Sequence, residues 1–303
     1  MNRRAIAAIG LAALVVVGFV LLAVGDRRLD GTPFKWRDSA VGRMLLGRSS
    51  SPQSPVARGA RANEAALLYE IRNASDVRAA YEKYKSMDDP TGAVPYALRR
   101  AMGDCGGFMD PAWYANLRSR TAPGDKPRRD ALLERSLQRC KGFSGWDQQM
   151  VYEAANVLYQ RAIDARYPPA LAEDLSIRFT DADREELAKQ LLSSPEIDGD
   201  VINGVYAYLM RLNGRGWRLD PGEAAIRNAA WMLLACNYGA DCGENNTYVT
   251  NTCLYIAVCE PDVQSVLPAT DPFLTPERMA EAARRVPILD AHIRSRDWSA
   301  LGF

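Results

Sequence analysis

The sequence predicts an all-α protein, an irregular stack of antiparallel helix pairs behind an N-terminal transmembrane helix. Three observations predict this fold. Residues 5–25 form an uncharged run of 21 residues close to the N-terminus. After residue 63, about a dozen short segments place apolar residues at helical spacing. The same part of the chain has no convincing alternation of polar and apolar residues, which a half-buried strand would require.

The composition is that of an ordinary globular protein. The chain has 303 residues, of which 48% are hydrophobic and 25% charged, so it is large enough for a sizeable core without a cofactor. Lys and Arg number 38 against 37 Asp and Glu, and a net charge of +1 does not favour nucleic acid as a partner. The single histidine, His292, argues against histidine-containing zinc sites and against Ser-His or Cys-His catalysis.

Residues 5–25 are predicted to be a signal anchor that crosses the inner membrane once. The run is long enough to span a bilayer as a helix, and Arg3 and Arg4 precede it as in a secretory signal. It is longer than the apolar part of a typical cleaved signal, which favours an uncleaved anchor. The alternative is cleavage after Ala23-Val24-Gly25, which would give a secreted or periplasmic protein.

Two sequence features disagree about the side of the membrane on which the main domain lies. Five basic residues follow the run closely, and the positive-inside rule would keep such a segment in the cytoplasm. They are Arg27, Arg28, Lys35, Arg37 and Arg43. Six cysteines, an even number, favour an oxidising compartment instead, and long domains are translocated largely regardless of charge. We therefore expect a periplasmic domain.

Residues 26–62 are predicted to be a flexible tether. The stretch 47–59 is rich in Ser and Pro and has no apolar period, which is typical of a linker. The folded part is expected to begin near Asn63. The domain organisation is therefore an anchor at residues 1–25, a tether at 26–62 and a disulfide-bonded helical domain at 63–303.

Apolar spacing and helix start signals predict the helices of this domain in order. The expected segments are residues 67–71, 77–84, 96–105, 110–117, 131–140, 151–163, 169–175, 181–192, 201–212, 220–236, 247–258, 263–267 and 275–286. Asp220 is an N-cap followed by proline at the first helical position. Ser75 is expected to cap the helix at 77–84, and Asn246 or Thr247 the one at 247–258. Gly239 is a left-handed helix stop, and Pro287 is expected to kink or interrupt the last helix.

The six cysteines are the only predicted site residues, as candidates for three disulfides: Cys105, Cys140, Cys236, Cys242, Cys253 and Cys259. Cys105 and Cys140 each end a helix on its apolar side, so we expect them to pair with each other. The other four form two Cys-x5-Cys units, for which pairing within each unit is favoured.

Two other pairings of these four cysteines and a metal site are the alternatives. A bond between Cys236 and Cys259 would have to bridge about 15 Å of intervening helix, whereas a disulfide tolerates about 7 Å between Cα atoms. A bond between Cys236 and Cys253 stays open, because both lie on core faces of neighbouring helices. A four-cysteine zinc site is disfavoured, since its ligands are usually two to four residues apart.

Two segments resemble known proteins of the helix-repeat type. Residues 155–171 read Ala-Asn-Val-Leu-Tyr-Gln-Arg-Ala-Ile-Asp-Ala-Arg-Tyr-Pro-Pro-Ala-Leu, similar to one SEL-type tetratricopeptide-like repeat. The pattern Trp231-x4-Cys236-x2-Gly239-x-Asp241-Cys242-Gly243 resembles uncharacterised anchored or secreted helical proteins of Gram-negative bacteria. The resemblance implies a tetratricopeptide-like or α-solenoid stack used for protein binding or scaffolding, with another protein or a cell-wall component as partner. It brings no activity with it.

The sequence predicts no catalytic residue, no cofactor-binding residue and no metal ligand. The alternative function is a cell-wall processing enzyme or its accessory, but the Glu-Ser and Gly-Leu-Met-Gln signatures of lytic transglycosylases are missing. Asp198-Gly199-Asp200 is interpreted as a helix-capping turn rather than a calcium loop. Eight aromatic residues are candidates for a groove, although most are expected in the core: Trp113, Tyr114, Trp146, Tyr152, Tyr206, Tyr208, Trp217 and Trp231.

Overall fold

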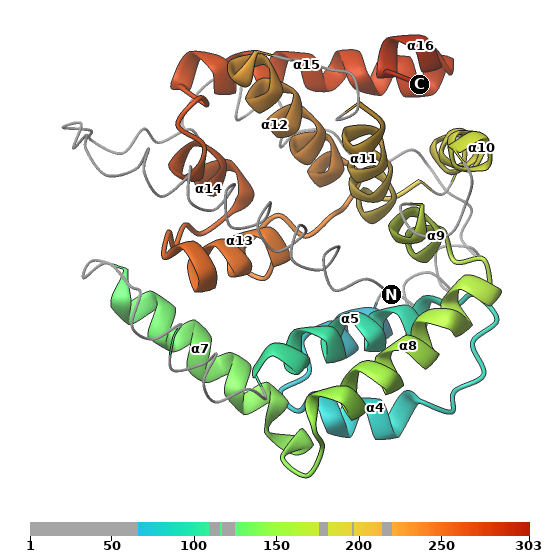
Figure 1. Ribbon diagram of the computed structural model, residues 1–303, viewed down its shortest axis with the longest axis vertical. Helices are drawn as coiled ribbons and strands as arrows, with labels where there is room; N and C mark the ends of the chain where they lie inside the picture. The colour runs from blue at the N-terminus through green and yellow to red at the C-terminus, as the bar shows by residue number, and fades with distance from the viewer. Residues whose placement is uncertain (1–65, 109–115, 117–124, 176–180, 196, 214–219) are drawn as a thin grey trace, which may run out of the picture. The chain divides into compact units, whose positions relative to one another are not determined.

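A computed structural model describes residues 66–303, except 109–115, 117–124, 176–180, 196 and 214–219 (Figure 1). All of these residues belong to one compact unit, Ser49–Phe303. They form helices and no strand, which confirms the all-α class. No helix in the described ranges is long and apolar enough to cross a membrane. The predicted anchor at 5–25 and the tether at 26–62 lie outside these ranges.

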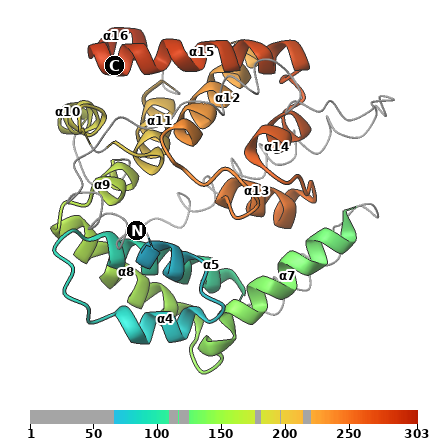
Figure 2. The ribbon, with the colours of Figure 1, turned by 180° about the vertical axis from the view of Figure 1, so that it is seen from behind.

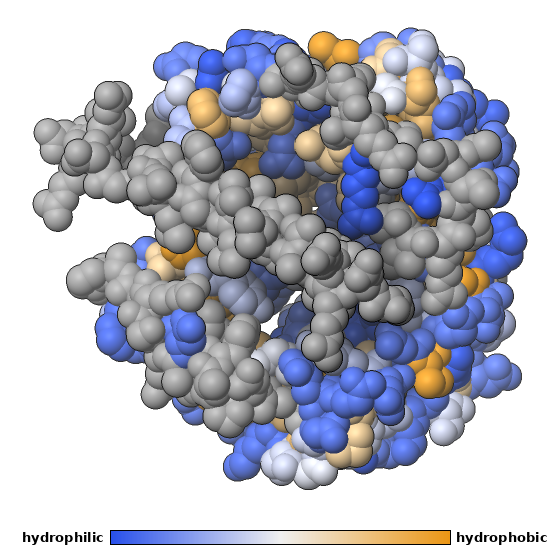
Figure 3. Space-filling view, viewed as in Figure 1, coloured by the Kyte–Doolittle hydropathy of each residue, from blue (hydrophilic) through white to orange (hydrophobic). Residues whose placement is uncertain are grey.

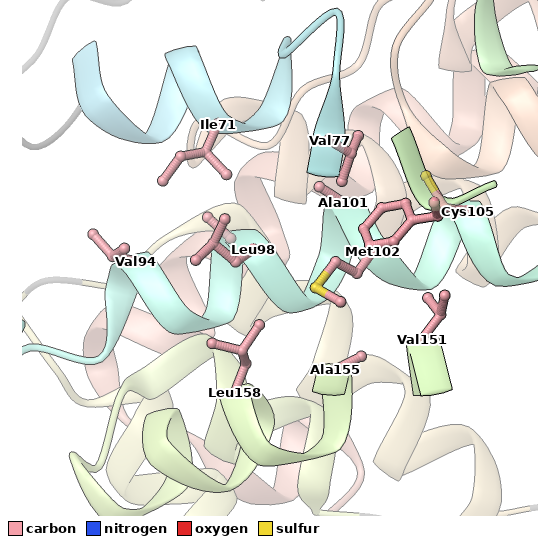
Figure 4. Close-up of a cluster of buried hydrophobic side chains, with 12 residues drawn as sticks. Ile71, Val77, Val94, Leu98, Ala101, Met102, Cys105, Val151, Ala155 and Leu158 are labelled. Atoms are coloured by element: carbon pink, nitrogen blue, oxygen red, sulfur yellow. The ribbon is translucent and has the colours of Figure 1, made fainter. Parts of the chain in front are cut away.

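The first group of helices packs around α5. Its members are residues 66–72, α4 (Val77–Tyr84), α5 (Ala93–Phe108), α7 (Lys126–Cys140), the 3-10 turn η2 (Lys141–Phe143) and α8 (Gln148–Asp164). Figure 4 shows α5 between residues 66–72 and α8, with Ile71 on one side of Leu98 and Leu158 on the other. Leu98 and Met102 are fully buried, so α5 is the centre of this core.

The second group continues the chain from α8. It contains α9 (Pro168–Asp174), α10 (Asp181–Leu192), α11 (Gly199–Asn213), α12 (Pro221–Asn237), α15 (Pro276–Ser295) and α16 (Trp298–Leu301). Each of α8, α9, α11, α12 and α15 contacts the next in this order, and α10 packs on α9 and α11. The rings of Tyr206 and Trp231 stack with centroids 5.5 Å apart and join α11 to α12.

Three short helices link the second group back to the first. They are α13 (Thr247–Asn251), the π-helical turn η3 (Thr252–Ile256) and α14 (Val263–Thr270). In Figures 1 and 2, α13 lies between α14 and the helices α5 and α7. α14 contacts α12, α13 contacts α14, and η3 contacts α7, which itself contacts α5. The contacts between successive helices therefore lead back to α5 and form a closed circuit of helices.

Side-chain caps explain where several helices begin. Asp220 accepts hydrogen bonds from Gly222 N at 3.0 Å and Glu223 N at 3.2 Å, as predicted. Asn246, the first of the two candidates, caps α13. The cap of α4 is Asp76, whose carboxylate accepts from Ala79 N at 3.0 Å, so the prediction of Ser75 is wrong. Ser75 stands one residue too early for its hydroxyl to serve that N–H.

The structure differs from the sequence-based predictions at two other points. A continuous α-helix over the predicted range 247–258 would place Ile256 on the same face as Val249 and Cys253. Those two residues are buried, yet Ile256 is 56% exposed, because the chain leaves the α-helix at Thr252 for a π turn and its register changes. α15 runs without interruption through Pro287, so of the two predicted outcomes, a kink or an interruption, the interruption is wrong. Gly239, with φ of +88°, has the predicted left-handed conformation.

All three disulfides join the favoured pairs. Cys105 bonds to Cys140, Cys236 to Cys242, and Cys253 to Cys259, with Cα–Cα distances of 5.3, 5.7 and 4.3 Å. The last pair requires the helix to end before Cys259. It does so at Ile256, where Ala257 follows with φ of +65°.

Candidate binding cavity

A cavity of about 1300 Å³ lies within the circuit of helices. Its walls come from residues 66–72, α5, α7, α11 and the segment around α13 and η3. Figure 3 shows a hollow on this face of the molecule, with both hydrophilic and hydrophobic residues on its visible rim. Because the walls come from segments far apart in the sequence, the fold alone brings them together.

Six tyrosines line the cavity: Tyr69, Tyr96, Tyr152, Tyr167, Tyr248 and Tyr255. Three of them are exposed to water, with exposed fractions of 71% for Tyr69, 40% for Tyr152 and 46% for Tyr255. Tyr152 lies against Gly106, where an added Cβ would come within 2.6 Å of its ring. Helix α5 therefore approaches this ring closely because position 106 has no side chain.

The remaining tyrosines are held by neighbouring groups. The rings of Tyr96 and Tyr167 lie 5.4 Å apart, and Tyr96 donates from its hydroxyl to Glu173 Oε2 at 3.1 Å. Burial raises the pKa of Tyr96, so its hydroxyl stays protonated. Tyr248 shares a hydrogen bond of 3.1 Å with Thr270 Oγ1. These rings are fixed parts of the wall, whereas Tyr69, Tyr152 and Tyr255 expose 40% or more of their surface.

Arginines form a second component of the lining: Arg72, Arg100, Arg135, Arg139 and Arg211. Arg100 joins opposite walls, because its Nη2 donates to Thr247 Oγ1 at 3.2 Å. Arg139 donates from Nε to Ala74 O at 3.0 Å and from Nη2 to Arg72 O at 2.7 Å. These contacts pin α7 to the end of the first described helix.

Acidic residues also line the cavity: Asp104, Glu173, Asp198, Asp200 and Asp241. Burial, and then the nearby charge of Asp200, raise the pKa of Asp198 to about 6. Asp198 Oδ1 accepts from Val201 N at 2.9 Å, which confirms the predicted capping turn at the start of α11. The pKa of Asp104 is also raised by burial. Its side chain is open to the cavity, yet the surrounding protein displaces bulk water.

The predicted disulfide cysteines support the cavity wall. Cys105 and Cys140 are themselves lining residues, and their bond joins two walls of the cavity, α5 and α7. The bond between Cys253 and Cys259 encloses Leu254 and Tyr255, which also face the cavity. The disulfides therefore hold parts of the lining in place.

The predicted groove aromatics divide into three sets. Tyr152 lines the cavity. Tyr206, Tyr208 and Trp231 are buried, and Trp146 packs at 5.4 Å from Phe143, as expected of core residues. Trp113, Tyr114 and Trp217 lie outside the described ranges. The other five lining tyrosines were not predicted, because no local pattern in the sequence sets them apart from tyrosines of the core.

The described residues include no group of three or more His, Cys, Asp or Glu side chains placed to hold a metal ion. His292 lies at the end of α15, where its Nδ1 is 3.2 Å from Asp297 Oδ2. It does not belong to the cavity lining. The arrangement around the cavity is suited to binding through aromatic rings, guanidinium groups and amides.

Comparison of the chain with protein-family models, with curated proteins and with solved structures finds no match. The function must therefore be argued from the cavity.

Proposed function

We propose that this protein binds an extended segment of another protein in its cavity. The observation that carries the proposal is the lining, which presents exposed tyrosines together with arginines and asparagines. Tyrosine offers a large ring and a hydroxyl at low cost in conformational entropy, and arginine offers a rigid fork of donors. Tyrosine and arginine are enriched at the protein interfaces where most binding energy is concentrated.

The size of the cavity supports a polymeric ligand. Pockets that hold one small molecule have volumes of roughly 300–1000 Å³ and are mostly apolar. This cavity has about 1300 Å³, and charged and amide side chains from several helices face it. The five asparagines are Asn73, Asn203, Asn245, Asn246 and Asn251. Such side chains suit the amide groups of a peptide backbone, which both donate and accept hydrogen bonds.

The chain-order contacts from α8 to α15 support the finer proposal of a solenoid-like stack. In helix-repeat proteins each unit packs on its neighbours and the stack presents a concave binding surface. Here α9, α11 and α12 follow one another in this way, and the resemblance of residues 155–171 to a SEL-type repeat falls at the start of the series. We extend the proposal to the location: residues 5–25 anchor the chain in the inner membrane, and the domain lies in the periplasm. The three disulfides support an oxidising compartment.

Site-specific photocrosslinking tests the proposal. A photoreactive amino acid at position 152 lies in the cavity, whereas the same group at position 157 lies on the same helix outside it, where Val157 is 63% exposed. We expect crosslinks to polypeptide from position 152 in intact cells, and none above background from position 157. Equal crosslinking at the two positions would count against the cavity as the binding site. Protease treatment of spheroplasts tests the location, since a periplasmic domain would be digested.

A cell-wall enzyme is the second candidate, because Asp104 and Asp198 have raised pKa values and face the same cavity. Carboxylic acids with raised pKa values serve as general acids in glycoside hydrolysis. Asp198 already caps α11, so Asp104 is the residue to test. Release of soluble fragments from purified peptidoglycan by the full chain, abolished by Asp104→Asn, would favour the enzyme. Binding without release would favour the proposed function.

A further inference from the structure

Three arginines lie together on one wall of the cavity. Arg135 and Arg139 are four residues apart on α7, so their side chains lie on the same helix face. Arg139 donates from Nη2 to Arg72 O at 2.7 Å, which places the third arginine beside them. All three line the cavity. We refer to Arg72, Arg135 and Arg139 as the arginine cluster.

The arginine cluster is only weakly neutralised by acids. Arg72 Nη2 is 3.4 Å from Asp200 Oδ2, and Arg135 Nη1 is 3.7 Å from Glu244 Oε1. A strong charge-assisted pair is shorter, at about 2.7–2.9 Å. The side chains of Arg72 and Arg135 are half exposed, at 46% and 50%. Burial lowers the pKa of Arg139. The negative charge of Asp104 opposes this shift, and the positive charge of Arg135 adds to it.

The acids of the cavity are largely occupied elsewhere. Glu173 Oε1 pairs with Arg99 Nη1 at 2.6 Å. Asp241 accepts from Gly243 N at 2.9 Å within its own turn. Asp198 caps α11 through the bond to Val201 N. Asp104 and Asp200 are the lining acids that remain beside the arginine cluster, and the contact of Asp200 with Arg72 is long, at 3.4 Å.

We propose that the partner segment is acidic, and that its carboxylate groups bind the arginine cluster. This inference rests on the proposed function and specifies the chemistry of the partner. The planar fork of a guanidinium matches the two oxygens of a carboxylate. Exposed tyrosines line the same cavity and provide surface for the rest of a polypeptide, which a free anion would not use. Charge and aromatic surface together fit an acidic peptide.

Binding of two matched peptides to the full-length protein in mild detergent tests this inference. The probe is a short, fluorescein-labelled peptide of alternating Glu and Tyr, and its control has Gln in place of every Glu. Fluorescence anisotropy gives both affinities. Since a hydrogen bond to a charged group contributes more than one between neutral groups, we expect the Glu peptide to bind about tenfold more tightly. Added salt should reduce this difference.

Substitutions of single arginines show whether the arginine cluster is responsible for the higher affinity for the Glu peptide. Arg135→Gln should weaken binding of the Glu peptide about tenfold, and Arg135→Lys should weaken it less, because the charge remains while the fork is lost. The matched control is Arg284→Gln on α15. Arg284 is 66% exposed, pairs with Glu281 and does not line the cavity. Its replacement removes the same charge and should leave the affinity unchanged.

Several results would overturn the inference. Equal affinity for the Glu and Gln peptides would show that the partner need not be acidic, although the cavity would still bind peptides. An equal loss in Arg135→Gln and Arg284→Gln would show an effect of bulk charge rather than of the arginine cluster. Binding of neither peptide, with binding of vesicles containing phosphatidylglycerol in their place, would also contradict it. Crosslinking from position 152 decides the proposed function separately.

Discussion

Disulfides are used differently in the two parts of the domain. In the first group of helices, the bond between Cys105 and Cys140 spans 35 residues and joins the ends of α5 and α7. From the end of α12 onward, the bonds Cys236–Cys242 and Cys253–Cys259 each span 6 residues and close single turns. A crosslink restricts the unfolded chain more when it closes a longer loop. The first bond therefore stabilises the fold, whereas the other two mainly shape the local backbone.

This difference follows from the packing around each bond. Cys105 is fully buried in the core formed by α5, α4 and α8. α7, in contrast, has few buried residues, namely Arg129 and Leu133. A helix with so little apolar contact depends on its covalent link to α5 for its position. α12 buries nine residues and needs no such link.

Removal of the long bond is expected to have the largest effect. Replacing both Cys105 and Cys140 by Ser should lower the free energy of unfolding by about 4 kcal/mol, since the unfolded chain regains the entropy of the closed loop. Urea unfolding of the oxidised full-length protein measures the change. A double variant that unfolds at the parent's midpoint would show that α7 is held without the bond.

The contact between α9 and α11 has no disulfide and tests packing alone. A Cβ at Gly204 would come within 2.7 Å of the Ala172 backbone, so Gly204→Ala should force the helices apart and cost about 2 kcal/mol of unfolding free energy. The matched control is Gly103→Ala on α5, where nothing lies within 4 Å of the added Cβ. There the higher helix propensity of alanine should stabilise by about 1 kcal/mol. Thermal unfolding should therefore show shifts of opposite sign.

Removal of a short bond is expected to have a smaller and more local effect. Replacing Cys253 and Cys259 by Ser should cost about 2 kcal/mol, because the loop is short. The loss of hydrogen-exchange protection should be confined to η3 and the residues that follow it. Loss of protection throughout α5 and α8 as well would show that the short bond stabilises the whole domain, as the long bond does.

The smallest expected effect is a pH dependence at the start of α11. The pKa of Asp198 is raised to about 6 in the folded state, so its contribution to stability is greatest below the unfolded pKa of about 4 and is lost as the pH rises through 6. Asp198→Asn keeps an N-cap but does not titrate. Relative to this variant, the parent should be more stable at about pH 5 than at about pH 8 in urea unfolding. A constant difference would contradict the raised pKa.

Local patterns in the sequence predicted the helices and their covalent links well. Asp220-Pro221 marked the start of α12, and Gly239 marked its end, because each depends only on neighbouring residues. The disulfide pairs followed from helix ends and turn lengths. The π turn was missed, since a change from i→i+4 to i→i+5 bonding leaves no clear trace in the order of apolar residues.

The cavity could not be predicted in the same way. Tyr69, Tyr152 and Tyr255 come from three segments separated by about 80 to 100 residues each, and no local period connects them. Their meeting depends on where α7 and η3 close the circuit of helices. Tyr206 and Tyr208, on the other hand, were correctly expected in the core, because they lie at helical spacing among apolar neighbours.

The closure between α7 and η3 has a consequence for the order in which the chain folds. Arg129 is fully buried and donates from Nη2 to Leu254 O at 2.6 Å, a carbonyl 125 residues further along the chain. A guanidinium buried before that carbonyl is in place would pay a large desolvation cost. The other helices of the first group can therefore assemble early, while α7 docks only after the chain as far as Leu254 has folded. We therefore expect α7 to be the last helix of the first group to take its place in the fold.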